Sequence, residues 1–114
     1  MLWGITSGCL FKFDPQTCRT LRSIRLYPYE WGSIYLKPHG LHFHQDGYLY
    51  GTAVDNVFRL DPQTWEYETL AARTSLFAQD GAGNVYMTKE RQIVCRYEPQ
   101  PEDAGKMTTA ELNG

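Results

Sequence analysis

LYGTAVDNVFRLDPQT, residues 49–64, has a near copy earlier in the same chain, LWGITSGCLFKFDPQT at residues 2–17. The two stretches align without a gap, and both end on Asp-Pro-Gln-Thr. An internal repeat of sixteen residues predicts a fold in which one structural unit occurs more than once. The other identical positions include Leu2/Leu49, Gly4/Gly51 and Phe11/Phe58, an offset of 47 residues.

A third, weaker copy follows at Val85-Tyr86 and Val94–Gln100, with one inserted residue. The stretch that precedes it, LFAQDG at 76–81, matches HFHQDG at 42–47. Within each copy, short apolar or aromatic segments are separated by Asp-Gly and Asp-Pro, which favour tight turns. We therefore expect four antiparallel strands per copy. In the middle copy these are Leu41–His44, Tyr48–Ala53, Val57–Leu60 and Trp65–Leu70, and the outer strand of the third copy is Thr108–Leu112.

Four short antiparallel strands in a unit of roughly 40 residues describe one blade of a β-propeller. The sequence thus predicts an all-β chain, a β-propeller fragment of about three four-stranded antiparallel blades. An incomplete first blade would occupy residues 2–27, a link 28–38, a second blade 39–72 and a third 73–112. A β-sandwich of seven or more strands is the alternative all-β fold, but it does not require a repeat.

The phrase resembles the blades of the propeller superfamily that includes streptogramin lyases, gluconolactonase and regucalcin proteins, and NHL-type repeats. The resemblance rests on turn and packing residues, namely Gly47, Leu49, Tyr50, Gly51, Phe58, Asp61, Pro62 and Thr64, with their counterparts. These residues are architectural, so the resemblance implies a fold and not a chemistry. It also implies that the links between blades lie on one rim and the Asp-Gly and Asp-Pro turns on the other.

The first copy opens at the second strand of its unit, because Leu2 corresponds to Leu49. Three blades are also fewer than the four to eight of a closed propeller. We therefore expect either that the chain is a segment of a longer propeller or that copies self-associate to complete a ring.

The link after the first blade is the first candidate ligand site. It is longer than the next link, near Ala71–Thr74, and it is rich in aromatic residues. Aromatic rings with polar tips suit sugar stacking or the anchoring of a peptide. The alternative is that the loop buries its own rings against the end of the blade. The candidate ligand-binding residues are Tyr27, Tyr29, Trp31, Tyr35 and His39.

The three histidines of the chain, His39, His42 and His44, fall close together. On a strand, His42 and His44 share a face and can present two nitrogens to one divalent metal. The spacing indicates no third ligand, and the matching residues of the next copy, Leu76 and Ala78, are apolar. Packed or hydrogen-bonded histidines are therefore the competing interpretation.

Catalytic motifs are absent from the sequence, which contains no nucleophile elbow, phosphate loop or recognisable Cys–His pair. We therefore expect a non-catalytic ligand-binding or scaffold propeller that needs no cofactor and takes a sugar or a peptide. The alternative is a propeller enzyme, a lyase or lactone hydrolase acting on sugar-like substrates, with a divalent metal near His42 and His44.

Composition excludes other classes of partner. The net charge of -2 and the pI of about 5.9 argue against nucleic acid and anionic membrane surfaces. No apolar run approaches the roughly 20 residues that span a bilayer. Cys9, Cys18 and Cys95 are odd in number and lack metal spacing. Cys95 and Cys18 replace Phe58 and Trp65 of the middle copy, so we expect buried thiols that fill apolar space, with a Cys9–Cys18 disulfide as the alternative. Reduced thiols slightly favour the cytoplasm, and the compartment is otherwise open.

Overall fold

The computed structural model describes residues 1–6, 8–28, 40–89, 93–100 and 105–111, apart from the side chain of Phe77. All the regular structure in these residues is β-strand, so the prediction of an all-β chain is confirmed. Within the same ranges, no helix has the length and apolar character needed to cross a membrane.

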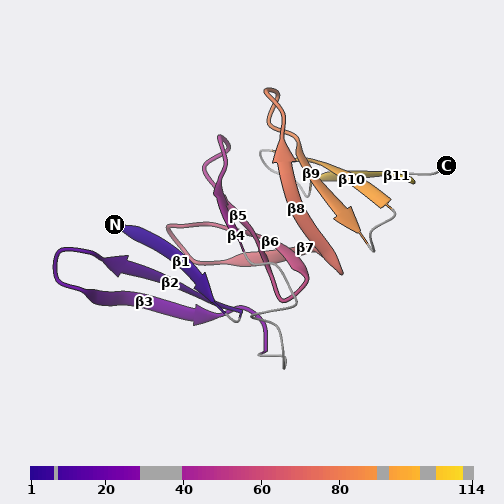
Figure 1. Ribbon diagram of the computed structural model, residues 1–114. Helices are drawn as coiled ribbons and strands as arrows, with labels where there is room; N and C mark the ends of the chain where they lie inside the picture. The colour runs from indigo at the N-terminus through magenta and orange to yellow at the C-terminus, as the bar shows by residue number, and fades with distance from the viewer. Residues whose placement is uncertain (7, 29–39, 90–92, 101–104, 112–114) are drawn as a thin grey trace.

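The strands within the described residues form three antiparallel sheets, and each sheet follows the order of the chain (Figure 1). The first sheet contains β1 (Leu2–Thr6), β2 (Cys9–Asp14) and β3 (Arg19–Arg25). The second contains β4 (Gly40–Phe43), β5 (Leu49–Ala53), β6 (Asn56–Leu60) and β7 (Tyr67–Ala72). The third contains β8 (Thr74–Gln79), β9 (Val85–Lys89), β10 (Ile93–Glu98) and β11 (Lys106–Glu111).

The sheets lie in a row, with the second between the first and the third (Figure 1). Apolar side chains fill both spaces between sheets. Because the second sheet is covered on both sides, every residue of β5 is buried. The first space is filled by Leu10, Leu26, Leu49, Ala53, Phe58, Leu60 and Trp65. The second is filled by Tyr50, Val57, Val85, Met87, Cys95 and Tyr97.

The Asp-Pro turns are built alike in the first two copies, as expected for structural aspartates. The Asp61 carboxylate accepts a hydrogen bond from the Gln63 N–H at 2.9 Å, and the Asp14 carboxylate accepts one from Gln16 at 2.9 Å. The residue that closes each turn has positive φ: 65° at Trp65 and 56° at Cys18.

Strand boundaries differ from the predicted ones mainly at these turns. The fourth strand of the middle copy begins at Tyr67 and not at Trp65, because the left-handed backbone of Trp65 belongs to the turn. The first strand of that copy ends at Phe43, so His44 lies just outside it. The outer strand of the third copy begins at Lys106, two residues before the predicted Thr108.

The cysteines are free, but their surroundings differ. Cys95 is buried between the second and third sheets, which confirms the expectation of an apolar filler. For Cys18 that expectation is wrong, since this residue is exposed. Its counterpart Trp65 packs on Trp3 of the first sheet with ring centroids 4.9 Å apart. Among the described residues no sheet covers the first sheet in the same way, so Cys18 has nothing to pack against.

The connection from β7 to β8 is fastened to the turn between β5 and β6. The Thr74 N–H donates to the main-chain oxygen of Asp55 at 3.0 Å, and the Thr74 hydroxyl donates to Ala71 at 2.9 Å. Thr74 is buried despite its hydroxyl, because both of its donors have partners. The third sheet therefore starts at a defined place beside the second.

Candidate functional site

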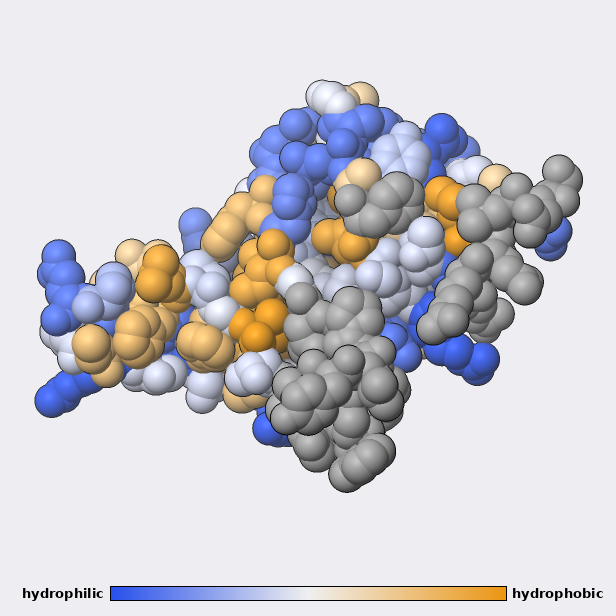
Figure 2. All heavy atoms as spheres, viewed as in Figure 1, coloured by the Kyte–Doolittle hydropathy of each residue, from blue (hydrophilic) through white to orange (hydrophobic). Residues whose placement is uncertain are grey.

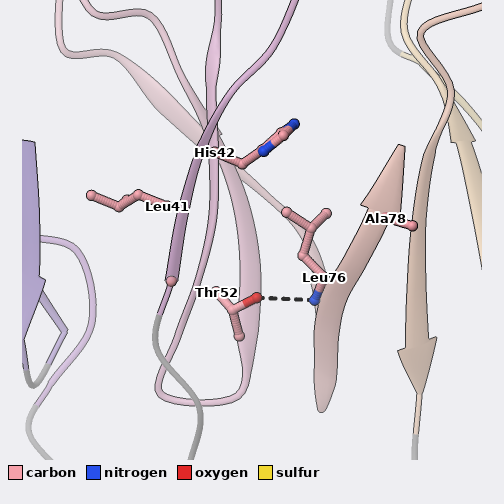
Figure 3. Close-up of a pocket in the computed structure, with 6 residues that line it drawn as sticks. Leu41, His42, Thr52, Leu76 and Ala78 are labelled. Carbon is pink, nitrogen blue, oxygen red and sulfur yellow. Dashed lines mark hydrogen bonds between the residues drawn. The ribbon is translucent and has the colours of Figure 1, made fainter. Parts of the chain in front are cut away.

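A cavity of about 240 Å³ lies where β4 of the second sheet faces β8 of the third (Figure 3). Its lining is mostly aliphatic, and it contains no formally charged side chain. Two polar side chains contribute, one from β4 and one from β5. The lining residues are Gly40, Leu41, His42, Thr52, Leu76 and Ala78.

Thr52 uses its hydroxyl oxygen to join the two sheets beside this cavity. The oxygen accepts a hydrogen bond from the Leu76 N–H at 3.0 Å (Figure 3). The main chain of β8 is thus hydrogen-bonded to the second sheet through the Leu76 N–H. The imidazole of His42 is then the polar group of the lining that is left for a ligand.

His42 points from β4 toward the side on which Leu76 and Ala78 lie, whereas Leu41 points the opposite way (Figure 3). Its Nε2 atom is buried and has no hydrogen-bond partner among the described residues. Buried polar atoms nearly always have a partner, so an open one needs an explanation. A hydrogen bond from Nε2 to a ligand in the adjacent cavity would explain it.

His44, the other half of the predicted metal pair, makes main-chain contacts on both ring nitrogens. Nε2 lies 2.7 Å from the main-chain oxygen of Gly83. Because a carbonyl oxygen can only accept, Nε2 carries the proton. Nδ1 lies 3.0 Å from the N–H of Asp46 and 3.0 Å from its carboxylate. His44 therefore joins the turn of the second sheet to that of the third.

A metal at His42 and His44 stays a prediction. Within the described ranges no three His, Cys, Asp or Glu side chains are grouped as metal ligands. To bind a metal through Nε2, His44 would have to give up its bond to Gly83. The lone Nε2 of His42 is the nitrogen that would remain.

Asp46 organises the turn next to His44. Its carboxylate accepts hydrogen bonds from the Tyr48 N–H at 2.9 Å and from the Tyr50 hydroxyl at 2.7 Å. Burial raises the pKa of Asp46, but these hydrogen bonds and the nearby His44 and Arg59 lower it more, so its pKa lies below the usual value. The carboxylate is therefore a structural anion.

The third sheet repeats this arrangement at Asp80, whose carboxylate accepts hydrogen bonds from the Asn84 amide at 3.0 Å and the Tyr86 hydroxyl at 2.9 Å. Hydrogen bonds from Asn84, together with those from Tyr86 and Ala82, lower the pKa of Asp80 to about 2. The same carboxylate–tyrosine pair thus supports the turn in both sheets.

Arg59 is the charged residue that sequence reasoning missed. Its guanidinium lies 3.6 Å from the centroid of the Tyr48 ring, with Nη2 3.4 Å from Asp46 and Nη1 3.7 Å from Glu68. Cavities of about 220 and 340 Å³ adjoin it. In the sequence Arg59 merely replaces Lys12 of the first copy, and nothing there indicates that it is enclosed between two carboxylates.

Tyr27 is the one candidate of the aromatic link that falls within the described residues. Its hydroxyl lies 2.7 Å from the Thr69 hydroxyl, and its ring packs near Phe58 and Tyr67, with centroids 6.4 and 6.3 Å apart. Burial raises the pKa of Tyr27. Tyr27 thus packs on the second sheet, while Tyr29, Trp31, Tyr35 and His39 lie outside the described residues.

Comparison of the chain with protein-family models, with curated proteins and with solved structures found no match.

Proposed function

We propose that the chain is a segment of a β-propeller and that it is a non-catalytic binding module. Three successive sheets, each a meander and each packed on the next by its face, support this interpretation. The connection between the second and third sheets is a further support, because it is short and runs from β7 to β8. β7 is one edge of the second sheet, and β8 is the edge of the third sheet that faces β4. In a propeller, repeated sheets follow one another around a central channel in this manner.

The ligand would bind in the cavity between β4 and β8. The observation that carries this proposal is the buried, unpartnered Nε2 of His42 beside about 240 Å³ of space. The aliphatic lining favours a ligand with an apolar face, and the lack of charge disfavours an ionic one because burying a lone charge is costly. A neutral sugar has both features: hydroxyl groups to pair with the imidazole and a CH face for Leu76.

The test is a titration of the 15N-labelled chain with neutral monosaccharides and short uncharged peptides. We expect one class of compound, the sugars, to move the resonances of His42, Thr52 and Leu76. His42→Phe should abolish these shifts, while His42→Gln, which keeps a hydrogen-bonding side chain, should retain part of them.

Two outcomes would contradict the proposal. One is that no compound moves these resonances, in which case the chain would be a scaffold that binds no ligand in this cavity. The other is that sugars shift the aromatic link and leave His42 in place, which would put the binding site at the rim.

A further inference from the structure

A second cavity, of about 220 Å³, lies on the second sheet beside its Asp-Pro turn. Its lining differs from that of the cavity at His42, because it combines charged side chains with tyrosine rings. The side chains come from β6, from β7, from the Asp-Pro turn between them and from the turn before β5. The lining residues are Tyr48, Arg59, Asp61, Glu66, Tyr67 and Glu68.

Arg59 has donors that the described part of the chain does not use. Its Nε atom is buried and has no hydrogen-bond partner among the described residues. Nη1 lies 3.7 Å from Glu68, beyond hydrogen-bonding distance, and Nη2 lies 3.4 Å from Asp46. A guanidinium has five N–H donors in one plane and pairs best with a carboxylate through two parallel hydrogen bonds. Arg59 is therefore suited to bind the carboxylate of a ligand.

Two further carboxylates line the cavity from the ends of the Asp-Pro turn. The Asp61 N–H donates to the main-chain oxygen of Glu66 at 2.8 Å, so these two residues lie opposite each other. The Glu66 side chain is exposed. A pair of carboxylates attracts an ammonium group, and the nearby ring of Tyr67 favours a cation as well. The cavity therefore offers groups for both signs of charge.

The repeat does not require these carboxylates. At the offset of 47 residues, Glu66 and Glu68 correspond to Arg19 and Leu21 of the first sheet. One acidic residue is thus replaced by a basic residue and the other by an apolar one, although both sheets form the same Asp-Pro turn. A role in the turn alone would not select glutamate at these positions.

The third sheet places a similar arginine in a different setting. Arg96 pairs with Tyr86 across the strands, as Arg59 pairs with Tyr50. Nη2 of Arg96 lies 3.0 Å from the Glu98 carboxylate, a hydrogen-bonding distance. Arg96 thus has a close carboxylate from its own strand, whereas the carboxylates around Arg59 are more distant.

Tyr48 holds the guanidinium of Arg59 in place. The guanidinium lies 3.6 Å from the centroid of the Tyr48 ring, which fixes its position over that ring. Tyr48 belongs to the turn between β4 and β5. Figure 2 shows hydrophilic residues gathered over this turn and the turn between β8 and β9, whereas apolar residues gather over the first sheet. The arginine is therefore oriented before a ligand binds, which lowers the entropic cost of binding.

We propose that this cavity binds a free α-amino acid in its zwitterionic form. The ligand carboxylate accepts hydrogen bonds from Nε and a neighbouring Nη of Arg59, and the ligand ammonium group donates to Asp61 and Glu66. A simple anion would be repelled by the two carboxylates, and a simple cation would leave the buried Nε unpaired. The space of about 220 Å³ corresponds to about seven water molecules, which suits a ligand of this size. The proposal does not depend on a ligand at His42.

The test is a titration of the 15N-labelled chain with L-leucine. We expect saturable shifts of the Arg59 Nε–H resonance and of the main-chain amides of Glu66 and Tyr67. Two derivatives with the same side chain are the matched ligands: N-acetyl-L-leucine lacks the ammonium charge, and L-leucinamide lacks the carboxylate. Each should bind at least about tenfold more weakly than L-leucine, because each loses one set of charge-assisted hydrogen bonds.

Variants assign the two charges of the ligand to the two sides of the site. Glu66→Gln changes an exposed side chain and should weaken L-leucine severalfold without weakening N-acetyl-L-leucine. Arg59→Lys keeps the charge but loses the Nε donor, and should weaken L-leucine without weakening L-leucinamide. Glu111→Gln, at an exposed glutamate of β11 outside the cavity, is the control and should change neither affinity. Glu66→Gln keeps the test decisive if Arg59→Lys does not fold.

Three results would overturn the proposal. Binding of either derivative as tightly as L-leucine would identify a site for a simple anion, a simple cation or an apolar side chain. Shifts at His42 and Leu76 in place of Arg59 would put the amino acid in the other cavity. The third is a lack of any shift at Arg59, Glu66 and Tyr67 at millimolar L-leucine.

Discussion

Nε2 of His44 lies 2.7 Å from the main-chain oxygen of Gly83, and this buried hydrogen bond joins the turns of two neighbouring sheets. His44→Phe would keep an aromatic ring at this position but would leave the oxygen of Gly83 and the N–H of Asp46 without their imidazole partner. We expect a loss of about 1–3 kcal/mol in the free energy of unfolding, measured by urea denaturation.

His42→Phe is the matched control, two residues away. The Nε2 atom of His42 has no partner among the described residues, so an apolar ring there removes an unsatisfied buried atom. The substitution should change stability by less than about 0.5 kcal/mol or increase it. Equal losses for the two variants would mean that His44 and His42 play the same structural role, against this account.

Asp46 should make the free energy of unfolding depend on pH in the acidic range. Its pKa is lower in the folded chain than the usual 3.9 or so of an unfolded chain. The carboxylate then contributes stability that is complete above about pH 4 and is lost as the pH falls through the lower, folded pKa. Asp46→Asn should therefore be less stable than the wild type at pH 7, and the difference should shrink below about pH 4. Urea denaturation from pH 7 to pH 3 measures it.

Tyr50→Phe provides a second variant at the same turn, because it removes the 2.7 Å hydrogen bond to the Asp46 carboxylate. The acid-dependent part of the stability should decrease and not vanish, since the Tyr48 N–H still donates. A stability difference for Asp46→Asn that stays constant across this pH range would refute the assignment.

Much of this fold could be predicted from the sequence, because turns and repeats are local features. The Asp-Pro and Asp-Gly turns placed most strands within one or two residues. The start of β7 was missed because positive φ at a tryptophan, as at Trp65, is not a preference of that residue.

The candidate site was less predictable, since it depends on contacts between distant segments. The pairing of His44 with Gly83 joins residues 39 positions apart, and no local pattern indicates it. The cavity beside His42 is lined by residues of two sheets, and Leu76 and Ala78 come from the next one. Histidines that look alike in the sequence, His42 and His44, therefore differ in the fold.

Gly8 should be the glycine least tolerant of a side chain in the first sheet. Its φ is 79°, and a Cβ atom would lie 2.5 Å from the main-chain oxygen of Tyr27. We expect Gly8→Ala to cost about 1–3 kcal/mol by thermal or urea denaturation. Gly81→Ala is the control, because nothing lies within 4 Å of its Cβ position. A similar effect of both substitutions would argue against the close packing at Gly8.

Tyr27 should contribute to stability and not to ligand binding. Tyr27→Phe removes the 2.7 Å contact with the Thr69 hydroxyl and should cost about 1 kcal/mol. A double-mutant cycle with Thr69→Val measures the coupling between the two hydroxyls, which should account for most of that loss. If Tyr27→Phe instead weakens sugar binding at unchanged stability, the ring belongs to a ligand site.

The arrangement of the three sheets is the central claim, and a crystal structure of the chain tests it most directly. We expect that one rotation relates the first sheet to the second and the second to the third. The common axis should lie on the side of β4 and β8. A third sheet folded back onto the first, so that the strands close a sandwich, would contradict it.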